Sequence, residues 1–384
     1  MNEKQVDRFL AAVVVAVFST PAFARTIDVP GDYPLIQSAI DVAADGDTVL
    51  AAPGTYTEDN ISFLGKSIVV RSEAPTDSSI VKLTTVQGTG NDSLFVFDSG
   101  EHWKSVLDGF TVINGRVGIS LNNASPIIRN CRIVRNGSPG DYWSSGVRAS
   151  YTALQLESCL IGWNGGMEGA GLNFFNSSPV VLNCQIVTNE CTSSGAGIYA
   201  GYGHLTVTNC RISGNTGAQW GSALYMGSGI LTMENCLLLD NVTTDSGALL
   251  LSSDSQGFLQ NCTVAGNSGG GLYVSYSQME VVNTILWGNG VEIMWGYGGG
   301  VGVSYSDIDG WWPGMGNIDA DPLFTSARGF DYLLGVNSPA IDAGDPSIPD
   351  GISDSHPRWP AWYPNGARSD MGAYGGPNND DWLR

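Results

Sequence analysis

Charged residues are scarce in this sequence, and positively charged ones are the scarcest. Asp, Glu, Lys and Arg make up 14% of the 384 residues, and 17 Lys and Arg oppose 37 Asp and Glu, which leaves a formal net charge of −20. A set of amphipathic surface helices would need more Lys and Glu, so a helical fold is disfavoured. The negative charge predicts no nucleic-acid partner and no attraction to anionic membranes.

Long hydrophobic runs are also lacking. The apolar run from Phe9 to Phe18 is too short to span a bilayer comfortably. It is followed by the small-residue pattern Ala22-Phe23-Ala24, and together these features predict a secretory signal peptide over residues 1–24. A retained anchor is the alternative. We therefore expect an exported protein, secreted or in the cell envelope, with no membrane insertion after the signal is removed.

Glycine, in contrast, is frequent at 51 residues, and a motif of the form N-C-x-[I/L/V]-x-x-N recurs along the middle of the chain. Degenerate copies flank the run, from Asp108 to Asn114 and from Asn283 to Asn289. The cysteines of the six clear copies follow one another at steps of 28, 25, 26, 26 and 26 residues, at Cys131, Cys159, Cys184, Cys210, Cys236 and Cys262. A period of this length indicates a supersecondary unit that stacks on copies of itself.

Between the motifs the sequence alternates with a period of two, as in Leu205-Thr206-Val207-Thr208. Alternation predicts short strands, and Gly, Ser and Asn fill the space where a leucine-rich repeat would place its convex segment. Three short strands per repeat fit better. We therefore predict an all-β fold, a single-stranded right-handed parallel β-helix (solenoid), whose coils cover residues 61–304. Each strand would pair with the equivalent strand of the next coil, about 4.8 Å away.

The last Asn of each motif is a natural residue for a ladder between coils. Its amide can donate a hydrogen bond to one neighbour and accept one from the other, and Asn tolerates turn conformations. The expected structural ladder consists of Asn136, Asn164, Asn189, Asn215, Asn241 and Asn267.

The cysteines of the motif allow two interpretations. The favoured one is a column of small, buried side chains, because Cys behaves as a compact apolar residue in protein cores. The alternative is a set of disulfides between adjacent coils, since the spacing of coils lies within the range a disulfide tolerates and an exported protein meets oxidant. Parallel neighbours in register point their Cβ atoms alike, which disfavours bridging. Cys191 lies outside the column.

Both ends of the solenoid carry patterns of their own. Residues 25–60 are predicted to form an N-terminal cap and the first strands, with a short capping helix in which Ile36, Ala39, Ile40 and Ala43 share one face. Residues 305–384 hold twelve Asp and no Glu against four Arg and no Lys, a local charge of −8 (4 − 12). We expect this Asp-rich segment to form a C-terminal module that caps the other end.

The strings I-Q-S-A-I, G-D-T-V and P-G-T-Y stand near the start of the chain, and D-A-D-P-L-F, S-P-A-I-D-A-G and D-M-G-A-Y stand near its end. With these strings, the chain resembles exported bacterial right-handed parallel β-helix proteins of the pectin-lyase-like fold. The first three strings look like the N-terminal cap of such proteins, and the last three look like a C-terminal module known as a choice-of-anchor Q domain. The resemblance implies the fold and leaves the activity open, because proteins of this fold include polysaccharide lyases, hydrolases, epimerases and adhesins.

The registers of the coils predict no catalytic column. The residues before each motif, and those after its cysteine, do not build a column of carboxylates. Five arginines nevertheless gather on the early coils, at Arg116, Arg129, Arg132, Arg135 and Arg148. If any face binds an acidic sugar, we expect this one, through Arg129, Arg132 and Arg135. Arg129 and Glu157 occupy equivalent positions on neighbouring coils, which predicts an exposed ion pair of little energy.

Aromatic residues are the better candidates for contact with a sugar, because a flat ring packs against the apolar face of a pyranose. Trp143 and Trp220 each fall between a ladder Asn and the Gly-rich strand that follows, and Trp163 precedes Asn164. Packing of loops is the alternative role for these rings. Tyr199, Tyr225 and Tyr273 follow the Gly-rich segments and are predicted to line the same face.

Three aspartates of the C-terminal segment, Asp342, Asp345 and Asp370, are candidate ligands for Ca²⁺, which prefers clustered oxygen ligands. Turn-capping beside Gly and Pro explains them equally well. Taken together, the sequence favours an exported β-helix protein that binds a polysaccharide or cell-surface glycan, or serves as an adhesive, surface or matrix component, without catalysis. The alternative is a polysaccharide-active enzyme, most plausibly a polysaccharide lyase.

Overall fold

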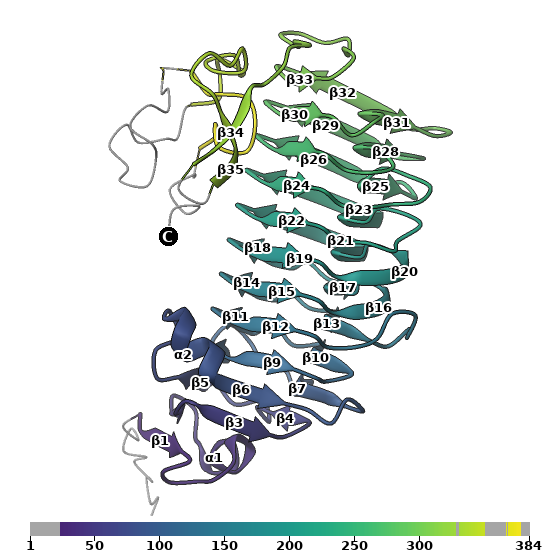
Figure 1. Cartoon of the computed structure of the whole chain (residues 1–384). Coiled ribbons are helices and arrows are strands. Elements are labelled where there is room, and N and C mark those ends of the chain that lie inside the picture. Colours follow the sequence, from purple (N-terminus) through teal and green to yellow (C-terminus); the bar gives the residue numbers. More distant parts are fainter. Residues whose placement is uncertain (1–23, 328–329, 350–365, 367, 378–384) are drawn as a thin grey trace, which may run out of the picture.

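The computed structural model describes residues 24–327, 330–349, 366 and 368–377. Their chain winds into a solenoid whose coils each contribute up to three short strands, and equivalent strands of successive coils pair in parallel (Figure 1). The strands thus form three rows, numbered here in chain order within a coil. This arrangement confirms the predicted all-β parallel β-helix with three strands per coil. The predicted signal peptide lies outside the described residues, except for residue 24.

Row 1 consists of β1 (Thr26–Val29), β2 (Thr48–Ala51), β5 (Val69–Ser72), β8 (Val106–Asp108), β11 (Ile127–Arg129), β14 (Gln155–Glu157), β18 (Val180–Leu182), β26 (Gln256–Gln260), β29 (Gln278–Val282) and β32 (Gly300–Ser304). Row 2 consists of β3 (Gly54–Thr57), β6 (Thr84–Gln87), β9 (Thr111–Ile113), β12 (Arg132–Val134), β15 (Leu160–Gly162), β19 (Gln185–Val187), β22 (Arg211–Ser213), β24 (Leu237–Leu239), β27 (Thr263–Ala265), β30 (Ile285–Trp287) and β33 (Asp307–Ile308). Row 3 consists of β4 (Ile61–Ser62), β7 (Ser93–Phe97), β10 (Val117–Asn122), β13 (Ser145–Ser150), β17 (Leu172–Phe175), β25 (Leu249–Ser252), β28 (Leu272–Val274) and β31 (Ile293–Trp295).

Two long strands, β21 (Ile198–Thr208) and β23 (Leu224–Glu234), run from row 3 into row 1 without a break. Two smaller sheets lie outside the rows: β16 (Gly165–Glu168) pairs in parallel with β20 (Glu190–Ser194), and β34 (Phe324–Ala327) pairs antiparallel with β35 (Phe330–Leu334).

The first Asn of the motif makes the sharp bend between rows 1 and 2. Asn130 and its equivalents on the following coils adopt positive φ angles, which Asn tolerates better than other non-glycine residues. Ser158 takes this position on one coil, with φ of 53°. The bend turns the alternating side chains of both rows toward one interior, where residues such as Ile128 and Ile133 are fully buried.

The last Asn of the motif forms the predicted ladder. Nδ2 of Asn189 donates to Oδ1 of Asn215 at 3.0 Å, and Nδ2 of Asn215 donates to Oδ1 of Asn241 at 2.9 Å. Each side chain also receives the backbone N–H of the preceding ladder residue and donates to a carbonyl of the preceding coil. The same bonds join all the predicted members from Asn136 to Asn267 and extend the ladder to Asn289.

The two ends of the ladder differ from its middle. The degenerate motif at Asp108 is shifted by one residue, because Asp108 pairs with Arg129 and Gly109 makes the bend. Gly115, rather than Asn114, therefore stands next to Asn136 and donates its N–H to Oδ1 of Asn136 at 2.9 Å. At the other end, both carboxylate oxygens of Glu292 accept from Asn289. The ladder thus begins at a backbone donor and ends at a carboxylate acceptor.

The cysteines of the motif form a second buried column. All seven cysteines are buried free thiols, and for the six of the column this is what the favoured interpretation predicted. Along the column the backbone N–H of Cys131 points to the sulfur of Cys159 at 3.4 Å. Thr284 and Ser306 continue the same contacts with their hydroxyl groups on the last coils. A small side chain that can accept a hydrogen bond is therefore what this position requires.

Helices cover the early part of the solenoid. The capping helix α1 (Ile36–Val42) buries Ile36, Ala39 and Ile40 completely against the first coils, as predicted. A second helix, α2 (Ser78–Leu83), was not predicted; Asp77 caps it by accepting from the backbone N–H of Ser79. Within the described residues, neither helix approaches the length and apolarity needed to cross a membrane.

The C-terminal segment covers the outside of row 2 on the late coils. Met371, Ala373 and Tyr374 pack on Leu237 and Leu239, whose side chains point outward there, in a second apolar cluster separate from the interior. The segment also contacts the bend residues: Nδ2 of Asn261 donates to the carbonyl of Asp370, and Nδ2 of Asn235 to the carbonyl of Pro377. The last row 2 strand, β33, lies within the residues that we assigned to this module.

Candidate functional site

The outward positions of row 3 line up in register across four coils. Strand registers place Arg148 beside Asn173, Asn173 beside Tyr199 and Tyr199 beside Tyr225. We call these four residues the row 3 face. The stacking of coils brings them together although they span 78 residues of the chain (225 − 148 + 1). The next positions in register are Leu250 and then Tyr273, so the predicted tyrosine series is interrupted by one aliphatic residue.

The two adjacent tyrosines of this face are stacked. The ring centroids of Tyr199 and Tyr225 lie 5.3 Å apart with an angle of 3° between the ring planes. Burial, together with the negative charge of Glu168, raises the pKa of Tyr199 to about 12. The Tyr199 ring therefore stays neutral at physiological pH, and the stacked pair offers a rigid, flat surface.

A loop between rows 2 and 3 carries aromatic rings over the beginning of the face. The guanidinium of Arg148 lies 4.7 Å from the ring centroid of Trp143 and donates to the carbonyl of Tyr142 at 3.1 Å. Burial lowers the pKa of Arg148. Trp143 keeps 54% of its surface exposed while its ring is held by the arginine.

Glu168, on β16, lies near Arg148. Burial raises the pKa of the Glu168 carboxyl, and the charge of Arg148 opposes this shift. Glu168 pairs with Ser194 of β20, and Ser194 pairs in turn with Trp220. Trp220 precedes β23 as Trp143 precedes β13, so both lie in loops before row 3 strands, and Trp220 is 45% exposed.

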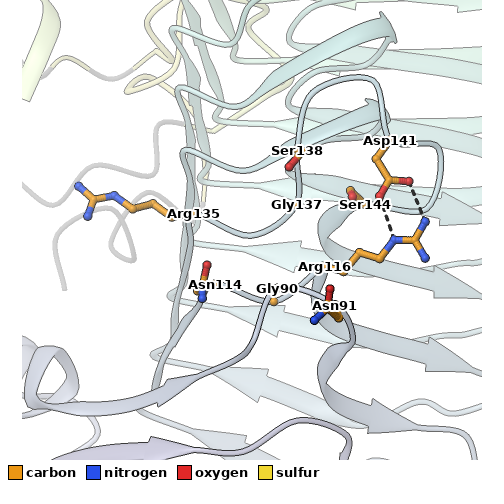
Figure 2. A pocket seen from close by; sticks show the side chains of 10 residues that line it. Gly90, Asn91, Asn114, Arg116, Arg135, Gly137, Ser138, Asp141 and Ser144 are labelled. Atoms are coloured by element: carbon orange, nitrogen blue, oxygen red, sulfur yellow. Dashed lines mark hydrogen bonds and ion pairs between the residues drawn. The ribbon is translucent and has the colours of Figure 1, made fainter.

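A polar pocket of about 380 Å³ adjoins the Trp143 loop (Figure 2). Arg116 binds Asp141 through two hydrogen bonds, from Nε to Oδ2 at 2.8 Å and from Nη2 to Oδ1 at 2.9 Å. The guanidinium holds the pKa of Asp141 far below its usual range. Oδ1 of Asp141 also accepts the backbone N–H of Trp143 at 3.0 Å. The ion pair thus fixes the loop that carries the tryptophan. The pocket is lined by Gly90, Asn91, Asn114, Gly115, Arg116, Arg135, Gly137, Ser138, Asp141 and Ser144.

The arginines predicted to bind an acidic sugar are divided between different sites. Arg129 forms its ion pair with Asp108 of the preceding coil, at 2.8 Å, and the predicted pair with Glu157 is therefore wrong. Both carboxylates are in register with Arg129, but Asp108 is nearly fully buried and its other oxygen accepts from Asn130. The side chain of Arg135 lines one edge of the polar pocket and extends away from it (Figure 2).

Arg132 lies in a separate groove of about 710 Å³ along the bends between rows 1 and 2, next to α2. Its Nε has no hydrogen-bond partner among the described residues, and burial lowers its pKa. Trp163 has the same place in its coil as Arg135 and is 47% exposed. The structure therefore brings Trp143 close to the row 3 face, and it does not gather all six predicted residues in one site.

The aspartates considered for Ca²⁺ make hydrogen bonds to the backbone. Oδ1 of Asp370 accepts from the N–H of Asp342 at 2.7 Å, and Oδ1 of Asp345 accepts from the N–H of Ser347 at 2.8 Å. Among the residues that the structure describes, no three His, Cys, Asp or Glu side chains form a group suited to a metal ion. Calcium binding stays a prediction.

Two residues of this region were missed by the sequence analysis, Asp141 and Glu168. The signal for Asp141 is weak: Val117 pairs with Ser145, so this coil is 28 residues long, and Asp141 stands 25 residues after Arg116, within reach of its side chain but three residues before the position in register. No comparable signal exists for Glu168, because β16 belongs to a short sheet outside the three rows.

Comparison with known proteins places the chain in a family. The model of the family described as right handed beta helix region matches residues 75–225 and 159–310, and these ranges together cover more than half of the chain. The chain belongs to this family, and the predicted fold of a right-handed β-helix is confirmed. No curated protein matches the sequence.

Among solved structures, the crystal structure of pectate lyase Pel9A is similar, with a TM-score of 0.57 and 14% sequence identity. The match covers 92% of this chain and 97% of the other. At this level of identity the likeness concerns the fold alone, which is the pectin-lyase-like β-helix that the motifs resembled.

Proposed function

We propose that the protein binds a polysaccharide on the row 3 face and beneath the Trp143 loop, without catalysis. The observation that carries this proposal is the continuous series of Trp143, Arg148, Tyr199 and Tyr225 across neighbouring coils. Coils repeat about every 4.8 Å, so the series presents rings and polar groups at regular steps along one direction. An extended chain of sugar units has the shape that such a surface accommodates.

The polarity of the face supports binding of sugars rather than of an apolar partner. Asn173 lies between the arginine and the tyrosines and is held by a hydrogen bond from its Nδ2 to the carbonyl of Glu168 at 2.8 Å. The hydroxyl of Tyr225 shares a hydrogen bond with Ser252 at 2.9 Å. Stacked rings edged by fixed hydrogen-bonding groups match the alternating apolar and hydroxyl surfaces of a pyranose.

The test is binding of the full chain to a panel of polysaccharides, followed by tryptophan fluorescence and calorimetry. Trp143→Ala removes the ring beneath which Arg148 is held, and we expect it to weaken binding at least tenfold. Trp103→Ala is the matched control, because Trp103 is 66% exposed and also lies beside a cation, Lys104, at 5.2 Å. Equal losses for both variants would contradict the proposal.

A second candidate function is a polysaccharide lyase, which the lowered pKa of Arg148 favours. Elimination from a uronate needs a group that takes a proton next to the carboxylate, and an arginine serves better when its pKa is depressed. Uronate polymers should then give unsaturated products, whose absorbance grows with time. Growth that is lost in Arg148→Lys would favour this function over binding alone; retention without products would support the first proposal.

We also propose that the protein is exported, on the evidence of the pattern over residues 1–24. Its place is then the cell envelope or the extracellular space, where a polysaccharide partner is available. Expression with cell fractionation and the mass of the exported chain test this. An exported chain that begins at Arg25 is expected, and a full-length chain retained in the cell would contradict it.

A further inference from the structure

The polar pocket beside the Trp143 loop carries information about the kind of sugar that the site accepts. Its walls come from neighbouring coils: Asn91 from one, Arg116 from the next, and Ser138 and Asp141 from the third. In Figure 2 the side chains of Arg116 and Asp141 meet at one side of the pocket, Asn91 lies below them, and Ser138 lies to the left of Asp141 at about the same height. The pocket is contiguous with the loop whose tryptophan begins the proposed binding surface.

The positive charge of Arg116 in this pocket is neutralised by carboxylates. Both oxygens of Asp141 are bound by Arg116, and Asp92 adds a further negative charge within range of the same guanidinium. The one other arginine that lines the pocket, Arg135, directs its side chain away from it (Figure 2). A carboxylate brought here would find the nearby cation already neutralised and would lose water without gaining an unpaired positive charge.

On the row 3 face, too, a carboxylate lies close to the positive charge. Arg148 is its only cation among the four residues that define it, and Glu168 lies close enough to act on it electrostatically. Arg116 of the pocket and Arg148 of the row 3 face thus each have a carboxylate beside them, Asp141 and Glu168 respectively. With a net charge of −20 on the chain, long-range forces also repel a polyanion.

The hydroxyl groups of a sugar, in contrast, complement the hydrogen-bond donors and acceptors that line the pocket. The ion pair uses Nε and Nη2 of Arg116 and leaves Nη1 as a donor, and the Asn91 amide and Ser138 hydroxyl add donors and acceptors. Oδ1 of Asp141 already accepts from Nη2 of Arg116 and from the backbone N–H of Trp143, so Oδ2 is the oxygen that offers a lone pair to a hydroxyl donor. Vicinal hydroxyls both donate and accept, so a sugar engages a guanidinium and a carboxylate at the same time.

From these contacts we infer that the pocket is a subsite for a neutral, hydroxyl-rich sugar unit, and that the glycan bound by the protein is neutral rather than uronate-rich. The inference rests on the proposed function, because the pocket is taken to hold one unit of the chain whose other units lie on the row 3 face. It assigns the Arg116–Asp141 pair a role in specificity in addition to its role in fixing the Trp143 loop.

The test compares acidic oligosaccharides with their carboxyl-reduced counterparts, which differ only in the replacement of each carboxylate by a hydroxymethyl group. We expect the wild-type protein to bind the reduced, neutral form at least tenfold more tightly. Asp141→Asn keeps the shape of the side chain and frees the charge of Arg116, so it should weaken binding of the neutral form and tighten that of the acidic form. Arg116→Gln combined with Asp141→Asn removes both charges and should abolish this new preference.

Each outcome decides between the inference and the function on which it rests. If Trp143→Ala abolishes binding while Asp141→Asn leaves the ratio of acidic to neutral affinity unchanged, the binding function stands and the pocket has no role in selection. Tighter binding of the acidic form by the wild-type protein would overturn the inference outright. If no oligosaccharide binds, the proposed function fails and the inference fails with it. Thermal melting of each variant verifies that the loop and coils remain folded.

Discussion

The asparagine ladder and the row 3 face run through the same coils, but they differ in how far the sequence repeats along them. From Asn136 to Asn289 the ladder position is Asn on every coil, whereas the row 3 face changes from Arg148 to Asn173 to Tyr199 over three coils. Each ladder amide is satisfied by identical amides above and below it, whereas each outward side chain of row 3 has partners of its own, as Asn173 has in the carbonyl of Glu168. Repetition therefore marks what holds the coils together, and loss of repetition marks where a specific site has room to form.

The largest expected effect comes from breaking the ladder. Asn215→Ala removes the side chain that accepts from Asn189 and donates to Asn241 and to the carbonyl of Ile186. Several buried groups lose their partners at about 1–3 kcal/mol each, so we expect a loss of at least about 3 kcal/mol and a clearly lower Tm. The control is Thr208→Ala, on an outward position of row 1, with a change below about 1 kcal/mol. Equal melting temperatures for the two variants would refute the importance of the ladder.

A smaller, pH-dependent effect is expected at the end of the solenoid, where repetition stops. Asp307 is fully buried, its Oδ1 accepts from the N–H of Ala320, and its Oδ2 has no partner among the described residues. Burial, with added repulsion from Asp319, Asp309 and Asp321, raises the pKa of Asp307 to about 7, from an ordinary value near 4. Between these values the folded state holds more protons than the unfolded state, so stability falls as pH rises toward 7.

Asp307→Asn should remove this dependence and raise stability above pH 7, on the order of one to a few kcal/mol. The measurement is Tm at intervals from pH 4 to pH 8 for both proteins. The matched variant Asp309→Asn alters a neighbouring carboxylate on the same acidic segment and should leave most of the slope in place. A wild-type Tm that rises across this range would contradict the assignment.

The smallest effect on the folded molecule is expected for the cysteine column. All seven thiols are buried, and burial raises the pKa of Cys131, Cys159, Cys184 and Cys236 within the column, so reactive thiolate is scarce. A thiol reagent should leave the native protein unmodified and its Tm unchanged, and should label seven thiols after denaturation without reductant. A count of one after denaturation would instead indicate that the column is bridged in pairs.

The repetitive part of the molecule is predictable from the sequence because each coil must present the same groups to the next. The motif therefore predicted the ladder residues, the three strands per coil and the buried cysteines. The predicted register was wrong by one residue only in the degenerate copy that ends at Asn114. There, glycine at positions 109 and 115 lacks the side chains that define the pattern. Helix α2 was missed for a related reason: it is a short segment inserted between coils, with no counterpart in the repeat.

The candidate site is less predictable, because several of its side chains have more than one possible partner and the sequence does not distinguish between these partners. Arg129 has a carboxylate in register on each side, and only the burial of Asp108 and its hydrogen bond to Asn130 decide in favour of that partner. Whether Arg132 points into the groove beside α2 depends on a helix that the repeat does not predict. Trp143 was identified by its place before a Gly-rich strand, but its contact with Arg148 depends on the path of a loop fixed by Arg116 and Asp141.

The direction of the ladder has a consequence for how proteins of this architecture change in size. Every internal junction joins the same donor to the same acceptor, whereas the first junction uses the backbone of Gly115 and the last uses Glu292. Excision of residues 190–215, one whole coil, would bring Asn189 against Asn241 and recreate the junction that was lost. Length is therefore adjustable in whole-coil steps, by duplication or deletion in the middle, while the two termini of the ladder stay fixed and the exposed residues of each added coil are free to diverge.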